Sequence, residues 1–119
     1  RLKRKDAFRR KPMVNHVFAL EKLLNKDMGY VEDSMHEDFL SVQEYEMVSR
    51  DEFLQQMKDW FEDPTLDLRN ANLRVLTDNE DIHTFQYERV KDGQRVRQTN
   101  VTFFKDGKIY RHMGHDVSI

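Results

Sequence analysis

Two histidines and an aspartate near the end of the chain are the side chains best suited to acid–base chemistry: His112, His115 and Asp116. A histidine exchanges its proton close to neutral pH, so His112 is a candidate general acid or base if it faces a cavity. The same residues could suggest a metal site. In a strand, however, residues three apart point to opposite faces, and His112 and Asp116 lie roughly 13 Å apart. We therefore expect no metal here.

Nucleophilic and phosphate-binding chemistry has little support in this sequence. The chain has no cysteine, which removes thiolate nucleophiles, disulfides and cysteine-type zinc sites together. None of its four serines lies in the sharp strand–turn–helix setting that exposes a nucleophilic serine. With four glycines in all, no glycine-rich phosphate loop is present. No motif therefore fixes a reaction, and no cofactor is expected.

The second half of the chain alternates apolar and polar residues, which is the period of β-strands. Asp92-Gly93 and Asp106-Gly107 interrupt this alternation, and Asp-Gly favours a two-residue hairpin turn because both positions tolerate positive φ. The pattern predicts four antiparallel strands: 66–77, 82–91, 94–105 and 108–117.

The first of these turns fixes which residues share a face of the predicted sheet. Counting outward from it places Tyr87 beside Gln98 and Phe85 beside Asn100. Aromatic walls with a few polar groups are typical of a ligand pocket, although amides that bond only to one another or to water would give the same pattern. The candidate ligand-binding residues on this inner face are Phe85, Tyr87, Gln98, Asn100 and Thr102.

The second turn, counted in the same way, places Arg97 opposite Asp116. The outer face would then carry a charge ladder of Glu88, Arg97 and Asp116, which suits solvent or a polar interface. A regular last strand would also put His112 on the outer face and Arg111 on the inner one. The sequence leaves the facing of these two residues open.

The first half of the chain reads mainly as helices. Apolar residues recur at helical spacing over 14–24, and a short second helix follows. Residues 39–48 read as extended. Ser49 and Glu52 then form a capping box, which starts a third helix that ends at Pro64. Helices followed by a meander of strands indicate an α+β fold.

Composition limits the chain to one globular domain. It has 119 residues, of which 38% are hydrophobic and 35% charged, and no apolar run approaches the length of a membrane helix. No signal peptide is expected at its basic start, and the absence of cysteine is compatible with a cytoplasmic location. We divide the chain into a basic arm over 1–12 and a domain over 13–119. The arm could contact nucleic acid or lipid, or be simply solvated. The acidic remainder argues against nucleic acid.

Three segments resemble the nuclear-transport-factor-2-like superfamily: MHEDF at 35–39, VSRDEFL at 48–54 and VTFFKDGKIYRH at 101–112. The similarity is closest to its polyketide-cyclase-like (SnoaL-like) and ketosteroid-isomerase-like members. It implies three N-terminal helices packed on a curved antiparallel sheet (a cystatin-like cone), and a homodimer formed through that sheet. It also implies that the third helix covers the cone, so that Trp60 reaches the cavity. Residues that match His112 often face the cavity in this family by way of a local bulge.

The resemblance also bears on isomerase chemistry, which needs a carboxylate base and an oxyanion hole. An ungapped count places the base position at Gln43, whose amide cannot abstract a proton, with Glu44 beside it. The position of the protonated aspartate falls on Asn100, which could still donate a hydrogen bond. Glu44 and His112 are therefore the candidate catalytic residues.

Three functions remain open from the sequence. The favoured one is a domain that binds a small apolar or aromatic molecule in the cone, with catalysis undecided and an isomerase- or cyclase-type enzyme as one variant. The alternative is a non-catalytic dimerisation or protein-interaction module, suggested by apolar Val101, Phe103 and Tyr110 on the outer face. The third is nucleic-acid attachment through the basic arm. This fold hosts many activities, so fold analogy cannot select among them.

Overall fold

Six strands form one mixed sheet that carries three α-helices, as the computed structural model of residues 16–119 shows. The predicted basic arm lies outside these described residues. The helices are α2 (His16–Leu24), α3 (Met28–Ser34) and α4 (Arg50–Glu62), with a 3₁₀ helix η1 (Leu68–Asn70). The strands are β1 (Met35–Gln43), β2 (Glu46–Ser49), β3 (Arg74–Asp78), β4 (Ile82–Lys91), β5 (Gln94–Lys105) and β6 (Lys108–Ser118).

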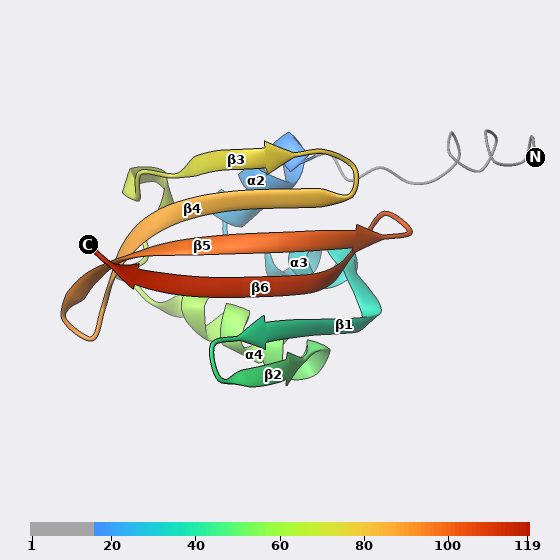
Figure 1. Ribbon diagram of the computed structural model, residues 1–119, viewed down its shortest axis with the longest axis horizontal. Coiled ribbons are helices and arrows are strands. Elements are labelled where there is room, and N and C mark those ends of the chain that lie inside the picture. The colour runs from blue at the N-terminus through green and yellow to red at the C-terminus, as the bar shows by residue number, and fades with distance from the viewer. Residues whose placement is uncertain (1–15) are drawn as a thin grey trace, which may run out of the picture.

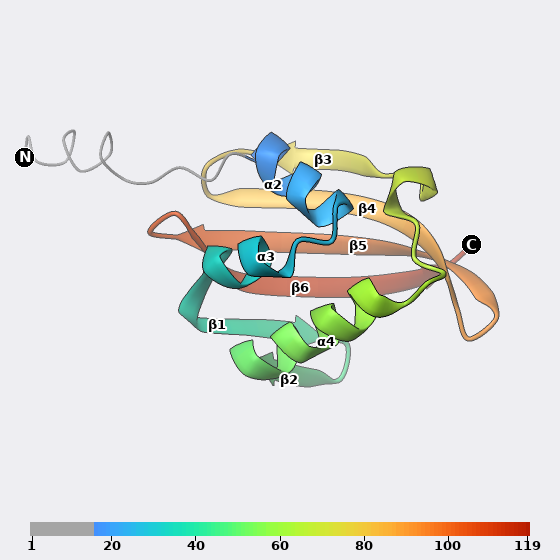
Figure 2. The same cartoon turned by 180° about the vertical axis from the view of Figure 1, so that it is seen from behind.

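The helices all lie against one face of the sheet. Figure 2 shows α2, α3 and α4 in front of it, whereas Figure 1 shows the opposite face with no described helix over it. The strand order is β2-β1-β6-β5-β4-β3; β1 and β6 are parallel, and all other neighbours are antiparallel. This arrangement confirms the predicted α+β class of helices packed on a sheet. No helix within residues 16–119 is long and apolar enough to cross a bilayer.

Helix α4 begins at the predicted capping box. The Ser49 hydroxyl accepts a hydrogen bond from the Glu52 amide at 3.3 Å, and the Glu52 carboxylate accepts one from the Ser49 amide at 3.0 Å. Both bonds satisfy amide groups that the first helical turn leaves without partners. The helix ends at Glu62, two residues before Pro64. Local sequence alone therefore fixes the start and end of this element.

The segment expected to be extended over 39–48 is a hairpin that belongs to the sheet. Strand β1 already begins at Met35, four residues before the predicted start, and turns at residues 44–45 into β2. Its other edge pairs in parallel with β6, so that Ser41 lies beside His112. The sheet therefore has strands on both sides of α4 in the sequence, and not only after the helices.

The strand expected over 66–77 is only partly formed. Residues Leu68–Asn70 make η1, and β3 starts at Arg74. Leu68 and Ala71 are buried and pack against Tyr87 in the core, while the Ala71 carbonyl accepts from the Glu88 amide at 2.8 Å. The chain turns inward here because burying these two apolar side chains outweighs continuing the alternation.

A β-bulge in β6 changes the register across the last hairpin. The register predicted for β4 and β5 is confirmed, with Tyr87 opposite Gln98. Between β5 and β6 the pairing shifts by one residue after Phe104, so Asp116 lies opposite Gln98 and not opposite Arg97. An extra residue in one strand turns every later side chain to the other face. The bulge therefore carries His112 and Asp116 to the face that the helices cover.

Candidate functional site

A cavity of about 720 Å³ lies between the inner face of the sheet and the helices. The structure places all six sequence-predicted ligand-binding residues on its lining: Trp60, Phe85, Tyr87, Gln98, Asn100 and Thr102. They come from α4 and from the hairpin of β4 and β5, which α4 faces across the cavity. A concave, mostly pre-formed space of this size is typical of a small-molecule site.

Aromatic rings form one wall of the cavity. Trp60 on α4 lies with its ring centroid 5.7 Å from that of Tyr87. The Tyr87 and Phe85 rings stack at 6.2 Å, and His83 continues the row at 5.7 Å from Phe85. These residues face inward because they alternate along β4. The wall offers flat apolar surface to a planar guest.

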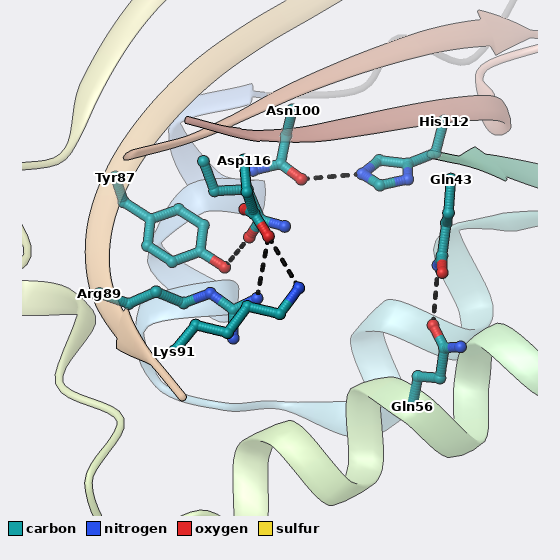
Figure 3. A network of polar contacts seen from close by, with 9 residues as sticks. Gln43, Gln56, Tyr87, Arg89, Lys91, Asn100, His112 and Asp116 are labelled. Atoms are coloured by element: carbon teal, nitrogen blue, oxygen red, sulfur yellow. Dashed lines mark hydrogen bonds and ion pairs between the residues drawn. The ribbon is translucent and has the colours of Figure 1, made fainter. Parts of the chain in front are cut away.

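A chain of three polar side chains links the buried Ser41 to His112 and Asn100, which line the floor of the cavity (Figure 3 shows the last two). The Ser41 hydroxyl lies 2.9 Å from His112 Nδ1, and His112 Nε2 lies 2.9 Å from Asn100 Oδ1. Because an amide oxygen only accepts, Nε2 carries the ring proton and donates it to Asn100. Nδ1 then holds the lone pair of the neutral imidazole and accepts from Ser41. This arrangement fixes one tautomer of His112.

Burial keeps His112 neutral. Loss of solvent lowers the pKa of this imidazole from 6.5 to about 4, because the charged form is disfavoured in a poorly hydrated site. The Phe53 ring packs at 5.1 Å from the imidazole. Both ring nitrogens are engaged by Ser41 and Asn100, so in this geometry His112 orients its neighbours.

Asn100 has one polar atom left over. Its Oδ1 accepts from His112, whereas its buried Nδ2 has no hydrogen-bond partner among residues 16–119. A buried amide donor without a partner is costly, so it marks a point where another acceptor would be favourable. The donor belongs to a residue that lines the cavity.

A second polar group lies two residues along the same strand. The Tyr87 hydroxyl donates to Gln98 Oε1, and burial raises the pKa of this phenol, which keeps it protonated. This hydrogen bond occupies the amide oxygen of Gln98. Its Nε2 lies near the cavity floor, 3.8 Å from the point where a Cβ on Gly114 would stand.

Charged side chains occupy the end of the cavity beyond Gln98. The Asp116 carboxylate lies 3.0 Å from Lys91 Nζ and 3.6 Å from the Arg89 guanidinium (Figure 3). The predicted outer ladder with Asp116 is therefore wrong. The Glu88–Arg97 pair of that ladder is confirmed: on the outer face Glu88 contacts Arg97 at 3.8 Å, and also Arg95 at 2.6 Å. The bulge in β6 accounts for the inward position of Asp116.

The carboxylate proposed as a base lies away from this floor. Glu44 is an exposed residue of the turn between β1 and β2, at the rim of the cavity. Gln43 faces inward, where its amide donates to Gln56 on α4 at 2.8 Å. Among residues 16–119, no cluster of three histidines or carboxylates could hold a metal ion.

Sequence reasoning missed four residues of the site. Ser41 was considered only as a nucleophile, because its partner in the site lies on a distant strand. Asp116 was placed on the wrong face. Arg89 and Lys91 could have been found, because the inward alternation of β4 that includes Tyr87 continues to them.

The fold is shared with solved structures, although the sequence itself is distant. No family model matches the chain, and no curated protein matches it. A protein from Sphaerobacter thermophilus is similar, with a TM-score of 0.67 and 10% identity over 88% of this chain and 97% of that one. An NTF2-like protein of unknown function from Mesorhizobium loti has a TM-score of 0.62 and 17% identity, over 82% and 83%. An NTF2-like protein of unknown function from Burkholderia xenovorans has a TM-score of 0.62 and 12% identity, over 83% of this chain and 77% of that one. The chain has the nuclear-transport-factor-2-like fold.

Proposed function

We propose that this protein binds a small, largely apolar or aromatic molecule in the cavity, and that Asn100 donates a hydrogen bond to an oxygen of that molecule. The observation that carries the proposal is the buried Nδ2 of Asn100, which has no partner among the described residues and is part of a residue that lines the cavity. The aromatic wall supports a flat guest. The buried amide supports a guest with a carbonyl or similar acceptor.

A bound guest would stabilise the site. An unsatisfied buried donor costs about 1–3 kcal/mol, which a ligand oxygen would recover. The Trp60, Phe85 and Tyr87 rings add apolar area at roughly 25 cal/mol per Å² removed from water. The charged group around Asp116 stands beyond Gln98, so an elongated guest would keep a polar end there.

Binding accounts for the floor of the cavity better than proton transfer does. The lone pair of His112 accepts from Ser41, and Glu44 stands exposed at the rim. Neither presents a base beside Asn100 in this geometry. We therefore assign His112 the role of orienting Asn100.

The test begins with native mass spectrometry of the purified protein to detect and identify a retained guest. Prodan, a fluorescent naphthyl ketone, is then titrated, because its emission moves to longer wavelength when its carbonyl accepts a hydrogen bond. Asn100→Leu keeps the side-chain size but removes the donor. It should weaken Prodan binding by about tenfold or more and shift the bound emission to shorter wavelength.

The matched control is Gln86→Leu, which removes an amide from the outer face of the same sheet, where it bonds to Thr99 at 3.0 Å. Binding by this variant should equal that of the wild type. A wild-type protein that carries no guest and does not bind Prodan would contradict the proposal. So would an Asn100→Leu variant with unchanged affinity and emission.

A second candidate function is dimerisation through the outer face of the sheet. Val42, Val101 and Met113 are cross-strand neighbours there, and Phe103 adjoins them; Met113 is 47% exposed and Phe103 39%. An exposed apolar cluster at the centre of a sheet favours an interface.

Sedimentation at micromolar concentration tests this second candidate. The wild type should be a dimer, and Met113→Lys should shift it toward monomer because a charge would be buried in the interface. Val90→Lys is the control, since Val90 is 67% exposed at the end of β4. A monomeric wild type, or a Met113→Lys variant that stays dimeric, would argue against this interface.

A further inference from the structure

The cavity has a second end, where β6 begins and β5 finishes, and its floor there is apolar. Met35, Ile109 and Phe104 are cross-strand neighbours on β1, β6 and β5, and all three line the cavity. Val31 on α3 and Leu20 on α2 line it from the side of the helices. These five residues, here called the apolar end, present hydrocarbon to both sides of the space.

Helix α3 covers the apolar end without packing into it. Figure 2 shows α3 in front of β5 and β6, near the start of β6, but none of the seven residues of α3 is buried. Val31 lines the cavity and is only partly buried. Protein interiors are normally packed as densely as organic crystals. A helix that covers a sheet without burying a side chain therefore leaves space for a guest.

Polarity changes along the cavity from the apolar end to the other end. Phe104 and Gln98 are six residues apart on β5 and both line the cavity, and this spacing corresponds to about 20 Å along a strand. Beyond Gln98 stand Asp116 and Lys91, and the Lys91 side chain is 50% exposed. The cavity is therefore elongated, apolar under α2 and α3 and charged where it meets water.

An elongated space with this polarity matches an amphipathic guest. Hydrocarbon stabilises a complex roughly in proportion to the area that leaves water. A strongly polar group is destabilised by burial without partners, so it favours the end where Lys91 is exposed. A compact ring system could lie against the aromatic wall of Trp60, Phe85 and Tyr87, but it would leave the apolar end empty.

We propose that the guest is a long-chain amphiphile. Its aliphatic chain lies in the apolar end, between α3 and the floor of Met35, Ile109 and Phe104, and its polar head points toward Lys91. The inference rests on the proposed binding function. It adds the chemical class of the guest and the direction in which the guest lies in the cavity.

Isothermal titration calorimetry of the wild type with 1-hexanol, 1-octanol and 1-decanol tests the chain. These alcohols share one uncharged head and differ only in chain length. Affinity should rise about fourfold for each CH₂ group that the apolar end buries. The heat capacity change of binding should become more negative in the same order, because more apolar surface leaves water.

Val31→Phe fills part of the apolar end and locates the chain. It should weaken binding of 1-decanol by about tenfold, whereas binding of 1-hexanol should change by less than about twofold, because the shorter chain does not reach α3. Urea unfolding shows whether the variant folds. If it does not, Leu20→Phe, on α2 at the same end, takes its place.

Val90→Phe is the matched control, since it makes the same change at a residue that is 67% exposed at the end of β4. Its affinity for each alcohol should equal that of the wild type. If affinity does not rise from 1-hexanol to 1-decanol, or if the apolar-end variant binds 1-decanol as tightly as the wild type, the inference is overturned. Prodan binding by the wild type would then still support the proposed function. If neither Prodan nor any of the alcohols binds, both fail.

Discussion

The buried contact between Ser41 and His112 gives the most quantitative prediction. Ser41 is fully buried, and its hydroxyl lies 2.9 Å from His112 Nδ1. Ser41→Ala removes this donor and leaves a buried ring nitrogen unpaired. Such a loss costs about 1–3 kcal/mol in the free energy of unfolding. For a domain of this size, this corresponds to a fall of about 4–12 °C in melting temperature.

A double-mutant cycle isolates the contact from the general cost of mutation. His112→Phe keeps a ring against Phe53 but has no nitrogen for Ser41 to donate to. In that background Ser41→Ala should change stability by less than about 0.5 kcal/mol, giving a coupling energy of at least about 0.5 kcal/mol. Urea unfolding followed by the fluorescence of Trp60, the single tryptophan, measures all four proteins.

Ser118→Ala supplies the control, because Ser118 is exposed and six residues farther along β6. Its effect should add to that of His112→Phe within about 0.5 kcal/mol. If Ser41→Ala and His112→Phe were equally additive, the hydrogen bond would contribute nothing measurable. Ser41 would then play no part in holding the His112 ring.

Three further predictions concern pH, the helix cap and a turn. The pKa of His112 is about 4 in the folded protein against 6.5 for a free imidazole, so as pH falls the unfolded chain is protonated first. The free energy of unfolding should drop by about 2 kcal/mol between pH 7 and 5, and the His112→Phe variant should lack this part of the pH dependence. If urea unfolding showed the same dependence on pH for the wild type and the variant, the prediction would be refuted. Ser49→Ala removes the cap of α4 and should cost about 1 kcal/mol, measured by urea unfolding; no change would mean that tertiary contacts alone hold the helix start. Gly93→Ala has open space around it but a φ of 77°, so it should cost about 1 kcal/mol through backbone strain, and a neutral result would show that the turn relaxes.

Local signals in the sequence account for much of the fold. The capping box at Ser49, the stop at Pro64 and the two Asp-Gly turns act over a few residues, so they can be read without knowing the rest of the structure. The register between β4 and β5 followed from one turn. Counting outward from the same turn also predicted that Phe85 and Asn100 lie on the inner face of the sheet.

The contacts that complete the site depend on distant parts of the chain. Ser41 reaches His112 only because β1 pairs in parallel with β6, across 71 positions of sequence. The charged group around Asp116 forms inside the cavity only because β6 contains a bulge. No periodicity within either strand reveals the pairing of the two.

The sequence by itself determined the class of fold, the start of α4, the hairpin turns and the aromatic inner face of β4 and β5, because these follow from local backbone preferences and from the two-residue period of strands. The tertiary structure alone decided which way His112 faces. One extra residue in β6 reverses the facing of every later side chain, and the two-residue period of the strand does not reveal where such a residue is inserted.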